Sequence, residues 1–197
     1  MEKESREKLI EAATPLFAQK GFAAVSIREL ANVAGINSAL VSYHFGGKEG
    51  LYAAVLEHQF SRIGRILEKV MEARLQPLER IEMYARQLAA THKEKPYLLR
   101  FVQSELVNPT GCFEVIIKKY ITQVFQFLYL TILEGIGQGH FKKDLNPVYA
   151  VMTLAGMLNF YFIAKPLARS ILPDIDKSDE EYVLHAVKIF LDGIKDN

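Results

Sequence analysis

The stretch that most constrains the fold is residues 26–48, which read as two short helices joined by a glycine turn. Ser26 and Glu29 have the spacing of a capping box, in which each side chain accepts a hydrogen bond from the other residue's backbone N–H. Gly35 follows the first helix, where a left-handed residue ends a helix and turns the chain. Asn37 can cap a second helix that begins at the next residue. This is the outline of a helix-turn-helix.

The second helix of the pair is poor in apolar side chains. Leu40 and Val41 alone are strongly apolar, so small and polar residues face outward or lie at the margins. These residues are Ser38, Ala39, Ser42, Tyr43 and His44. Small residues allow close approach to a groove floor, and hydroxyl or imidazole groups can hydrogen-bond phosphates or base edges. The pattern predicts a helix that reads DNA, and the alternative is a three-helix packing unit without a nucleic acid partner.

A longer ordered set of residues around this pair carries a resemblance to a known family. The set is Ala12, Ala13, Leu16, Phe17, Ala18, Lys20, Gly21 and Phe22, then Ser26, Ile27, Arg28, Leu30, Ala31, Ala34, Gly35 and Ile36, then Tyr43, His44, Phe45, Gly46, Gly47, Lys48, Glu49 and Leu51. In this order, residues 6–57 resemble the N-terminal domain of the TetR family of bacterial transcriptional regulators. Residues 37–45 are most similar to its AcrR-like or CecR-like branch. So long a match disfavours the packing-unit alternative.

The resemblance implies DNA contacts at defined positions. Ser26 and Arg28 match positions that usually bind phosphates, and Tyr43, His44 and Lys48 match a clamp on the DNA backbone. Such contacts fix register rather than sequence.

Three further positions match those that family members often use for base contacts. They are Ser38, Ala39 and Ser42, where relatives frequently carry a lysine at the first and an aromatic ring at the third. Because both are small here, we expect specificity to depend more on close packing, water or DNA shape. Leu40 is either a core residue or a contact for a thymine methyl group.

The overall charge argues against binding driven by charge alone. The net charge is +1, and residues 1–48 hold six Lys or Arg against five Glu. A nonspecific nucleic acid binder is normally more basic. We therefore expect a few placed cations rather than a basic surface.

Apolar residues three and four apart recur along the whole chain, which predicts an all-α fold. Helices are expected over residues 4–20, 48–72, 78–92, 97–106, 112–134, 147–165 and 179–194, in addition to the pair above. We expect a three-helix helix-turn-helix DNA-binding domain over residues 1–47, followed by a helical-bundle ligand-binding and dimerisation domain over residues 48–197. The 48–72 helix would join them as a rigid lever. Gly135, Gly137 and Gly139 are expected to end the 112–134 helix, and Pro166 and Pro173 to bound the last long loop.

Residues 147–164 hold eighteen uncharged positions, which reaches the lower limit of a membrane span. Thr153 and Asn159 interrupt its apolar character and the segment stands alone, so we interpret it as an interface helix. The resemblance implies that the last two helices pack with those of a second subunit into a four-helix interface. A two-fold dimer would bind a pseudo-palindromic operator in double-stranded DNA.

The resemblance also implies a small-molecule inducer that enters the larger domain and tilts the connecting helix. Aromatic and methionine residues that could line its site are Tyr84, Phe101, Phe125, Tyr129, Met152, Met157 and Tyr161. Polar residues that could orient it are Gln87, His92, Gln103, Thr131 and Asn159. Ordinary core is the commoner role for residues of these types. General pocket chemistry predicts a mostly apolar ligand, of unknown identity.

Other classes of function find little support in the residues. Cys112 is the only cysteine, which excludes an intrachain disulfide and favours an inert thiol in a reducing compartment. The five histidines have no metal-ligand spacing, and no phosphate loop or catalytic motif is present. The acidic run Asp174, Asp176, Asp179, Glu180 and Glu181 fits helix-dipole compensation. We expect neither an enzyme nor a cofactor or metal.

The sequence therefore predicts a cytoplasmic, homodimeric, ligand-responsive transcriptional repressor of the TetR type. The second hypothesis is a helix-turn-helix dimer whose C-terminal domain binds a protein partner in place of a small molecule. A third and more distant one is an all-helical enzyme that reuses the fold.

Overall fold

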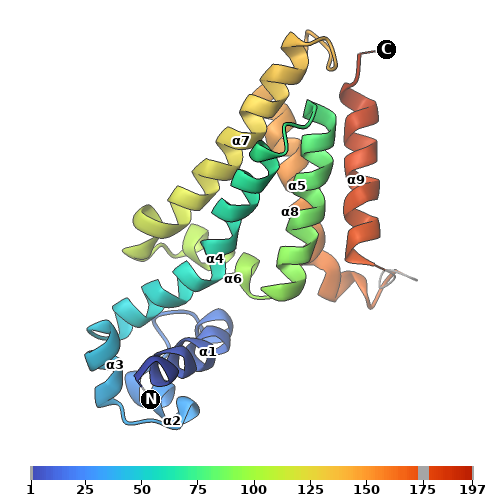
Figure 1. Cartoon of the computed structure of the whole chain (residues 1–197). Coiled ribbons are helices and arrows are strands. Elements are labelled where there is room, and N and C mark those ends of the chain that lie inside the picture. Colours follow the sequence, from blue (N-terminus) through green and yellow to red (C-terminus); the bar gives the residue numbers. More distant parts are fainter. Residues whose placement is uncertain (1, 173–177, 197) are drawn as a thin grey trace. The chain divides into compact units, whose positions relative to one another are not determined.

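The computed structural model describes residues 2–172 and 178–196, and this part of the chain is built from helices and turns (Figure 1). The all-α prediction is confirmed. The helices are α1 (Glu2–Lys20), α2 (Ile27–Ala34), α3 (Ala39–Phe45), α4 (Lys48–Glu72), α5 (Pro77–Glu94), α6 (Leu98–Val107), the π-helical segment η1 (Phe113–Ile117), α7 (Lys118–Gly137), α8 (Pro147–Ala168) and α9 (Asp179–Ile194). The bounds of α4 and α9 agree with the predicted ranges.

The chain divides into two compact units, and α4 contributes to both. Unit 1 comprises residues 1–61 and 97–120, and unit 2 comprises residues 62–96 and 121–197. Unit 1 thus contains the predicted DNA-binding domain together with the first half of α4, α6 and η1. The domain boundary at residue 47 and the rigid lever stay predictions.

Unit 1 has a small apolar core around α1, which packs against α2, α3 and α6. Its fully buried side chains include Leu9, Phe17, Leu30, Val41, Leu51 and Val55. The Tyr52 ring lies edge-on to Phe17, with 5.0 Å between centroids. Gly50 allows the start of α4 to approach the end of α3, because a Cβ at residue 50 would lie 1.8 Å from the carbonyl oxygen of Phe45.

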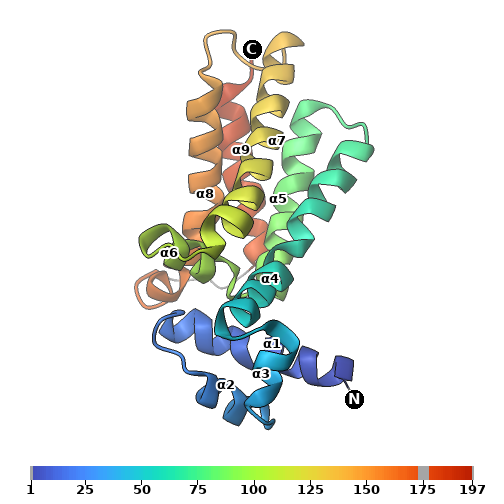
Figure 2. The ribbon, with the colours of Figure 1, turned by 90° about the vertical axis from the view of Figure 1, so that its left-hand side faces the viewer.

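Unit 2 is a bundle in which the second part of α4 joins α5, α7, α8 and α9 (Figure 2). Helix α9 packs against α5 and α8. Helix α4 contributes Ile66 and Val70 to the core of this unit.

Three local predictions about the second half of the chain are wrong in detail. Gly135 lies inside α7 rather than at its end, because the Phe141 ring packs where a Cβ would stand, 2.2 Å from the nearest ring atom. Pro166 lies within α8, which continues to Ala168. The 112–134 segment begins as a π-helical turn, which apolar periodicity does not reveal. Pro173, Asp174 and Asp176 lie outside the described residues.

Side-chain caps begin both late helices, α8 and α9. The Asn146 side chain accepts hydrogen bonds from the N–H groups of Val148 and Tyr149, at 3.0 and 3.2 Å. The Ser178 hydroxyl accepts one from the N–H of Glu181 at 3.3 Å. Both helices therefore start where the cap residues place them.

Helix α8 exposes an apolar stripe along one side. Its exposed large apolar residues are Val148, Tyr149, Met152, Phe160, Ile163 and Leu167, and those from Tyr149 to Met152 and from Phe160 to Leu167 recur three or four apart. Gly156 lies in the same stripe, and a Cβ there would meet nothing within 4 Å. By length and hydropathy α8 is the one helix of the described residues that could cross a membrane, which is weak evidence by itself. The outward face of α8 is thus far more apolar than an ordinary solvated helix surface.

Candidate nucleic-acid interface

The turn between α2 and α3 is fixed by local contacts that the sequence predicts. The Ser26 hydroxyl accepts a hydrogen bond from the Glu29 N–H at 3.2 Å, which caps α2. Gly35 ends the helix in the left-handed region, with φ 66°. The Asn37 side chain accepts from the Ala39 N–H at 2.9 Å. These contacts set the angle at which α3 leaves the turn.

The reciprocal half of the predicted capping box is not observed. The Glu29 carboxylate instead accepts a hydrogen bond from the Lys20 ammonium at 2.5 Å. This bond lowers the pKa of the Glu29 carboxyl, because the nearby ammonium favours its ionised form. The ion pair links the end of α1 to α2. Because Lys20 and Glu29 are not close in the sequence, no local pattern predicts the pair.

Helix α3 presents the predicted outward face. Ser38, Ala39, Ser42 and Tyr43 are all exposed, and the Tyr43 side chain keeps 70% of its surface accessible. Val41 points into the core and Leu40 is half-buried, which favours a packing role for Leu40. The exposed residues are three and four apart, so they share one side of α3. This side is small and polar, with one aromatic hydroxyl at its edge.

His44 lies at the margin of that face. It is half-buried, and its ring lies edge-on to Tyr43 at 5.0 Å and to Phe45 at 6.1 Å between centroids. The guanidinium of Arg6 covers the Phe45 ring at 5.2 Å. His44 is therefore oriented by aromatic packing next to the exposed face.

Lys48 is used inside unit 1. Its ammonium donates to the carbonyl oxygens of Phe22 and Val25 at 2.9 Å each, and to that of Ala23 at 3.5 Å. It also lies over the Phe22 ring, 4.4 Å from the centroid. A phosphate contact by Lys48 would have to replace these bonds, so the predicted clamp role stays a prediction. The observed contacts hold the α1–α2 loop against the start of α4.

Few cations remain for DNA among residues 4–48. Arg28 is exposed on α2 and makes no ion pair among the described residues. Lys8 pairs with Glu4 at 2.8 Å, and Lys20 pairs with Glu29. Arg6 and Lys48 make the internal contacts described above, so Arg28 is the cation that remains. It lies with Ser26 at the exposed start of α2, beside backbone N–H groups that favour anions.

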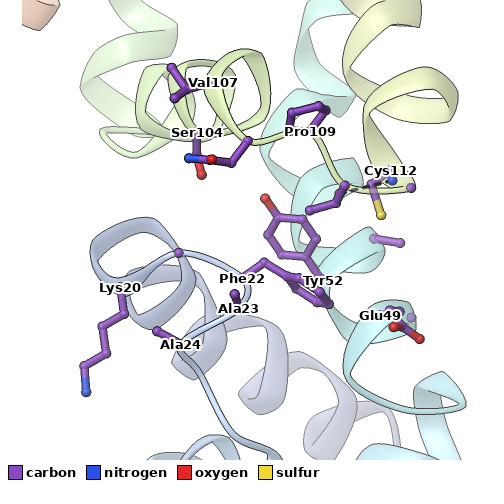
Figure 3. Close-up of a pocket in the computed structure, with 16 residues that line it drawn as sticks. Lys20, Phe22, Ala23, Ala24, Glu49, Tyr52, Ser104, Val107, Pro109 and Cys112 are labelled. Atoms are coloured by element: carbon purple, nitrogen blue, oxygen red, sulfur yellow. Dashed lines mark hydrogen bonds between the residues drawn. The ribbon is translucent and has the colours of Figure 1, made fainter.

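A pocket of about 1100 Å³ lies next to this domain within unit 1 (Figure 3). The α1–α2 loop, the first turns of α4 and the α6–η1 loop form its walls. Behind it, the Tyr52 hydroxyl donates to the buried Glu105 carboxylate at 2.7 Å, and the Thr110 N–H donates to the same carboxylate at 3.0 Å. This network joins α4 to the α6–η1 loop across 53 residues of sequence, which local patterns cannot predict.

Cys112 also lines this pocket, and burial raises the pKa of its thiol. The neighbouring carboxylates act in the same direction, whereas a hydrogen bond with Thr110 opposes them. A raised thiol pKa lowers reactivity, which supports the interpretation of Cys112 as an inert residue.

The predicted ligand-lining residues are not brought together in one place. Phe125, Tyr129 and Met152 line a shallow apolar pocket of about 240 Å³ between α7 and α8. Met157 lines a different pocket of about 520 Å³ at α8 and α9. Phe101 is buried in unit 1.

The remaining two are core residues of unit 2. The buried Tyr84 ring contacts Phe127, with 5.6 Å between centroids. Tyr161 stacks on Tyr182 at 3.8 Å. A ligand role for any of the seven stays a prediction.

The polar residues proposed for orienting a ligand have internal partners in several cases. Thr131 donates to the Phe127 carbonyl at 2.9 Å, and Asn159 donates to the Ala155 carbonyl at 2.9 Å. His92 is buried against the Phe162 ring, with 4.0 Å between centroids. These contacts are those of ordinary core residues.

The fold and the geometry of α2 and α3 define a helix-turn-helix protein of the DNA-binding class. Comparison with known proteins extends this. Residues 9–55 match the family described as bacterial regulatory proteins, tetR family. A probable HTH-type transcriptional regulator of Bacillus subtilis, YttP, is 30% identical over 142 residues, which are 68% of this chain and 66% of that protein.

Another relative is the HTH-type transcriptional repressor Rv3405c of Mycobacterium tuberculosis, 42% identical over 82 residues, which are 41% of this chain and 43% of that protein. The match covers less than two thirds of either relative. Among solved structures, the ketosteroid transcriptional regulator KstR2 of Mycobacterium tuberculosis shares the fold, with a TM-score of 0.80 at 21% identity over 98% of this chain and 95% of that one. The TetR-family regulator PfmR of Thermus thermophilus also does, with a TM-score of 0.76 at 21% identity over 93% and 97% of the two chains.

The chain belongs to the TetR family of bacterial regulatory proteins. The family resemblance predicted from the sequence is confirmed, and it places the chain among DNA-binding regulators rather than enzymes. The AcrR-like or CecR-like branch stays a prediction. The hypothesis of a protein partner in place of a small molecule is not favoured by these relatives.

Proposed function

We propose that this protein is a cytoplasmic transcriptional repressor that binds a pseudo-palindromic DNA operator as a homodimer and is released by a small, mostly apolar molecule. The observation that carries the proposal is the outward face of α3. It is exposed, small and polar, and it follows a capped turn in a chain of the TetR family.

The proposed docking places α3 in the major groove. Ser38, Ala39 and Ser42 would approach base edges, while Tyr43 and His44 would contact the DNA backbone. Ser26 and Arg28 would bind phosphates at the start of α2. Because the three residues at the groove floor are small, the proposal assigns much of the specificity to fit, ordered water and DNA deformability.

The dimer is proposed to form through the apolar stripe of α8, with α9 at its margin. An exposed apolar stripe on a long helix marks an interaction surface. The outward side of α9 carries mostly polar residues, including Glu181, His185, Lys188 and Asp192, which suits the rim of an interface better than its centre. A two-fold arrangement of α8 would pair two copies of α3 for two half-sites.

The test is selection of bound fragments from random-sequence DNA by the purified protein. Enrichment of one palindromic motif, bound well above background at physiological salt, is the expected result. Enrichment of no motif, with only weak and salt-sensitive binding, would contradict a sequence-specific regulator.

A further inference from the structure

The pocket of about 1100 Å³ in unit 1 has a mostly apolar wall (Figure 3). Phe22 and Ala24 come from the α1–α2 loop, Ala53 from α4, and Val107 and Pro109 from the end of α6 and the loop after it. Mostly apolar lining with a few polar groups is typical of small-molecule sites, and this volume is close to the upper limit of their usual range. None of the seven aromatic and methionine residues that the sequence suggests for a ligand lines this pocket.

Two carboxylates at this pocket lack a cationic partner among the described residues. Glu49 is exposed in the first turn of α4, lines the pocket and makes no ion pair in that part of the chain. Glu105 is buried behind the wall, and its partners are neutral donors: the Tyr52 hydroxyl at 2.7 Å, and the N–H and hydroxyl of Thr110 at 3.0 and 2.9 Å. Glu49 therefore offers an accessible contact, whereas Glu105 acts on the pocket only through its charge.

Cys112 on the pocket wall reports the combined effect of these two carboxylates. Burial is the largest cause of the raised pKa of its thiol, and the charges of Glu105 and Glu49 raise that pKa further, against a hydrogen bond with Thr110 that lowers it. A negative potential opposes formation of a thiolate and favours a cation in the same place. The wall near Cys112 is therefore a favourable environment for positive charge.

The cations near the pocket are already engaged. Lys20 is the one cation among the described lining residues, and its ammonium pairs with Glu29 at 2.5 Å. Lys48 lies outside the lining, and its ammonium donates to backbone carbonyls of the α1–α2 loop. With the Lys20–Glu29 pair neutral, the charge of Lys48 offsets only one of the two carboxylates. The balance of these groups is negative, which attracts cationic ligands into a cleft and disfavours anionic ones.

We propose that this pocket binds an organic cation, a protonated amine carried by a largely apolar, aromatic body. The ammonium pairs with the Glu49 carboxylate, and the body lies against Phe22 and Val107. The inference rests on the proposed function, because it names the site and the chemical class of the releasing molecule. The ligand contacts the α1–α2 loop, which leads directly into Ser26 and Arg28 at the proposed phosphate contacts. Displacement of this loop is the expected route from ligand binding to release of DNA.

The experiment uses the full-length protein and three probes of similar shape at neutral pH. The probes are 2-naphthylmethylamine, 2-naphthylmethanol and 2-naphthoate, which carry a positive charge, no charge and a negative charge at this pH. Titration calorimetry at physiological salt is expected to find the amine bound most tightly and the carboxylate least tightly.

Removal of the accessible carboxylate tests the ion pair. Glu49→Gln keeps the size of the side chain, and it is expected to weaken binding of the amine by about 2- to 5-fold, as for the loss of one exposed ion pair. Binding of 2-naphthylmethanol should not change. Glu11→Gln removes another exposed carboxylate of unit 1 that lies outside the lining, and this control should bind all three probes as the parent protein does.

A second pair of variants tests the location. Val107 is 76% exposed and lines the pocket, whereas Val33 is 54% exposed on α2 and lies outside the lining. Because both side chains are exposed, an arginine at either position should leave the fold intact. Val107→Arg should weaken the amine and tighten 2-naphthoate, each by about 3-fold or more, since it places a cation on the pocket wall. Val33→Arg is the control and should keep the affinities of the parent protein.

The outcomes separate this inference from the proposed function. Equal affinity for the amine and the alcohol, tightest binding of 2-naphthoate, no binding of any probe, or unchanged affinities in Val107→Arg would each overturn it. An equal effect of Glu49→Gln on the amine and the alcohol would overturn it as well. If the predicted order and variant effects hold but saturating amine leaves binding to the selected operator unchanged, the site and its ligand class stand. In that case the release step of the proposed function fails.

Discussion

Helix α3 in unit 1 and helix α8 in unit 2 each turn one side to solvent, and the two sides have opposite chemistry. The exposed side of α3 carries two serines, an alanine and a tyrosine, which a monomer can keep hydrated. The exposed side of α8 carries Tyr149, Met152, Phe160, Ile163 and Leu167, which water solvates poorly. The exposed side of α3 therefore suits a hydrated, polar partner such as DNA, whereas the exposed side of α8 suits a protein interface that excludes water.

The two units also differ in what holds them together. Unit 1 combines local caps and left-handed glycines around one turn with the bonds of Lys48, whose partners lie 23 to 26 residues away in the sequence. Unit 2 depends on packing between helices distant in sequence, and it buries Arg80 and His92 in that packing. Changes that break one unit should therefore leave the other largely intact.

The largest effect is expected from a charge placed in the α8 stripe. Phe160 is 66% exposed, so Phe160→Glu should fold normally as a subunit. In a two-fold dimer both copies lose the burial of an aromatic ring, about 3–6 kcal/mol in total, so the dimer dissociation constant should rise by more than about 100-fold. Sedimentation velocity measures this directly.

Two other variants calibrate that result. Val115→Glu places the same charge on an equally exposed apolar residue of η1 and should leave the dimer intact. Gly156→Leu adds bulk where nothing in the subunit lies within 4 Å, so it should weaken the dimer without destabilising the subunit. A Phe160→Glu protein that sediments as the parent does would show that the stripe is not the interface.

A smaller effect is expected from acid, and it should act through unit 2. Burial lowers the pKa of His92 to about 4, although Asn159 and Asp179 oppose the shift. The folded state therefore binds this proton less readily than the unfolded chain, whose histidine titrates near 6.5. Stability from His92 is complete above pH 6.5 and is lost as the pH falls toward 4, by about 3 kcal/mol over that window.

Urea unfolding at several pH values can isolate this contribution. The difference in unfolding free energy between the parent protein and His92→Gln should change across that window, because the variant has no group to protonate at residue 92. A constant difference from pH 7 to pH 4 would mean that His92 is protonated equally well in both states.

The smallest of the three effects separates the two basic residues of unit 1 that were predicted to bind phosphates. Lys48→Met removes three hydrogen bonds to the α1–α2 loop and should destabilise unit 1 by about 1–3 kcal/mol. Operator binding should weaken while its dependence on salt stays the same. Arg28→Met removes the same charge from an exposed position, so it should leave stability unchanged and reduce the salt slope of the dimer by about two, one phosphate contact for each copy.

Fluorescence anisotropy on labelled operator at several salt concentrations, with urea unfolding of the same samples, distinguishes these cases. A reduced salt slope in Lys48→Met would restore the phosphate clamp that the family resemblance implies for this residue. An unchanged slope in Arg28→Met would remove Arg28 from the proposed interface.

Local signals made most of unit 1 predictable. Ser26, Gly35 and Asn37 each act within a few residues, and the structure places all three as the sequence predicts. The internal role of Lys48 was not predictable, because its partners lie 23 to 26 residues away and the family pattern suggests another use. The residue type determines which groups a side chain can bind, but only the fold determines which of those groups lie close enough to be bound.

Helices were equally predictable in unit 2, but their detailed packing was not. The sequence predicts Gly135 as a helix terminator, but it lies inside α7, where the ring of Phe141 leaves no room for a Cβ. Arg80 and Gln123 carry no pattern that distinguishes them from solvated helix residues, since their burial depends on three helices meeting. Aromatic and methionine residues drew attention because they are common in pockets, yet several of them fill the core.

The most direct test of the account joins the two surfaces in one measurement. Affinity is measured for the selected palindrome and for the same DNA with one half-site scrambled, in the parent protein and in Phe160→Glu. Scrambling one half-site is expected to remove most of the affinity of the parent protein and almost none of the remaining affinity of the variant. An equal loss in both proteins would contradict the claim that α8 pairs two copies of α3 on one operator.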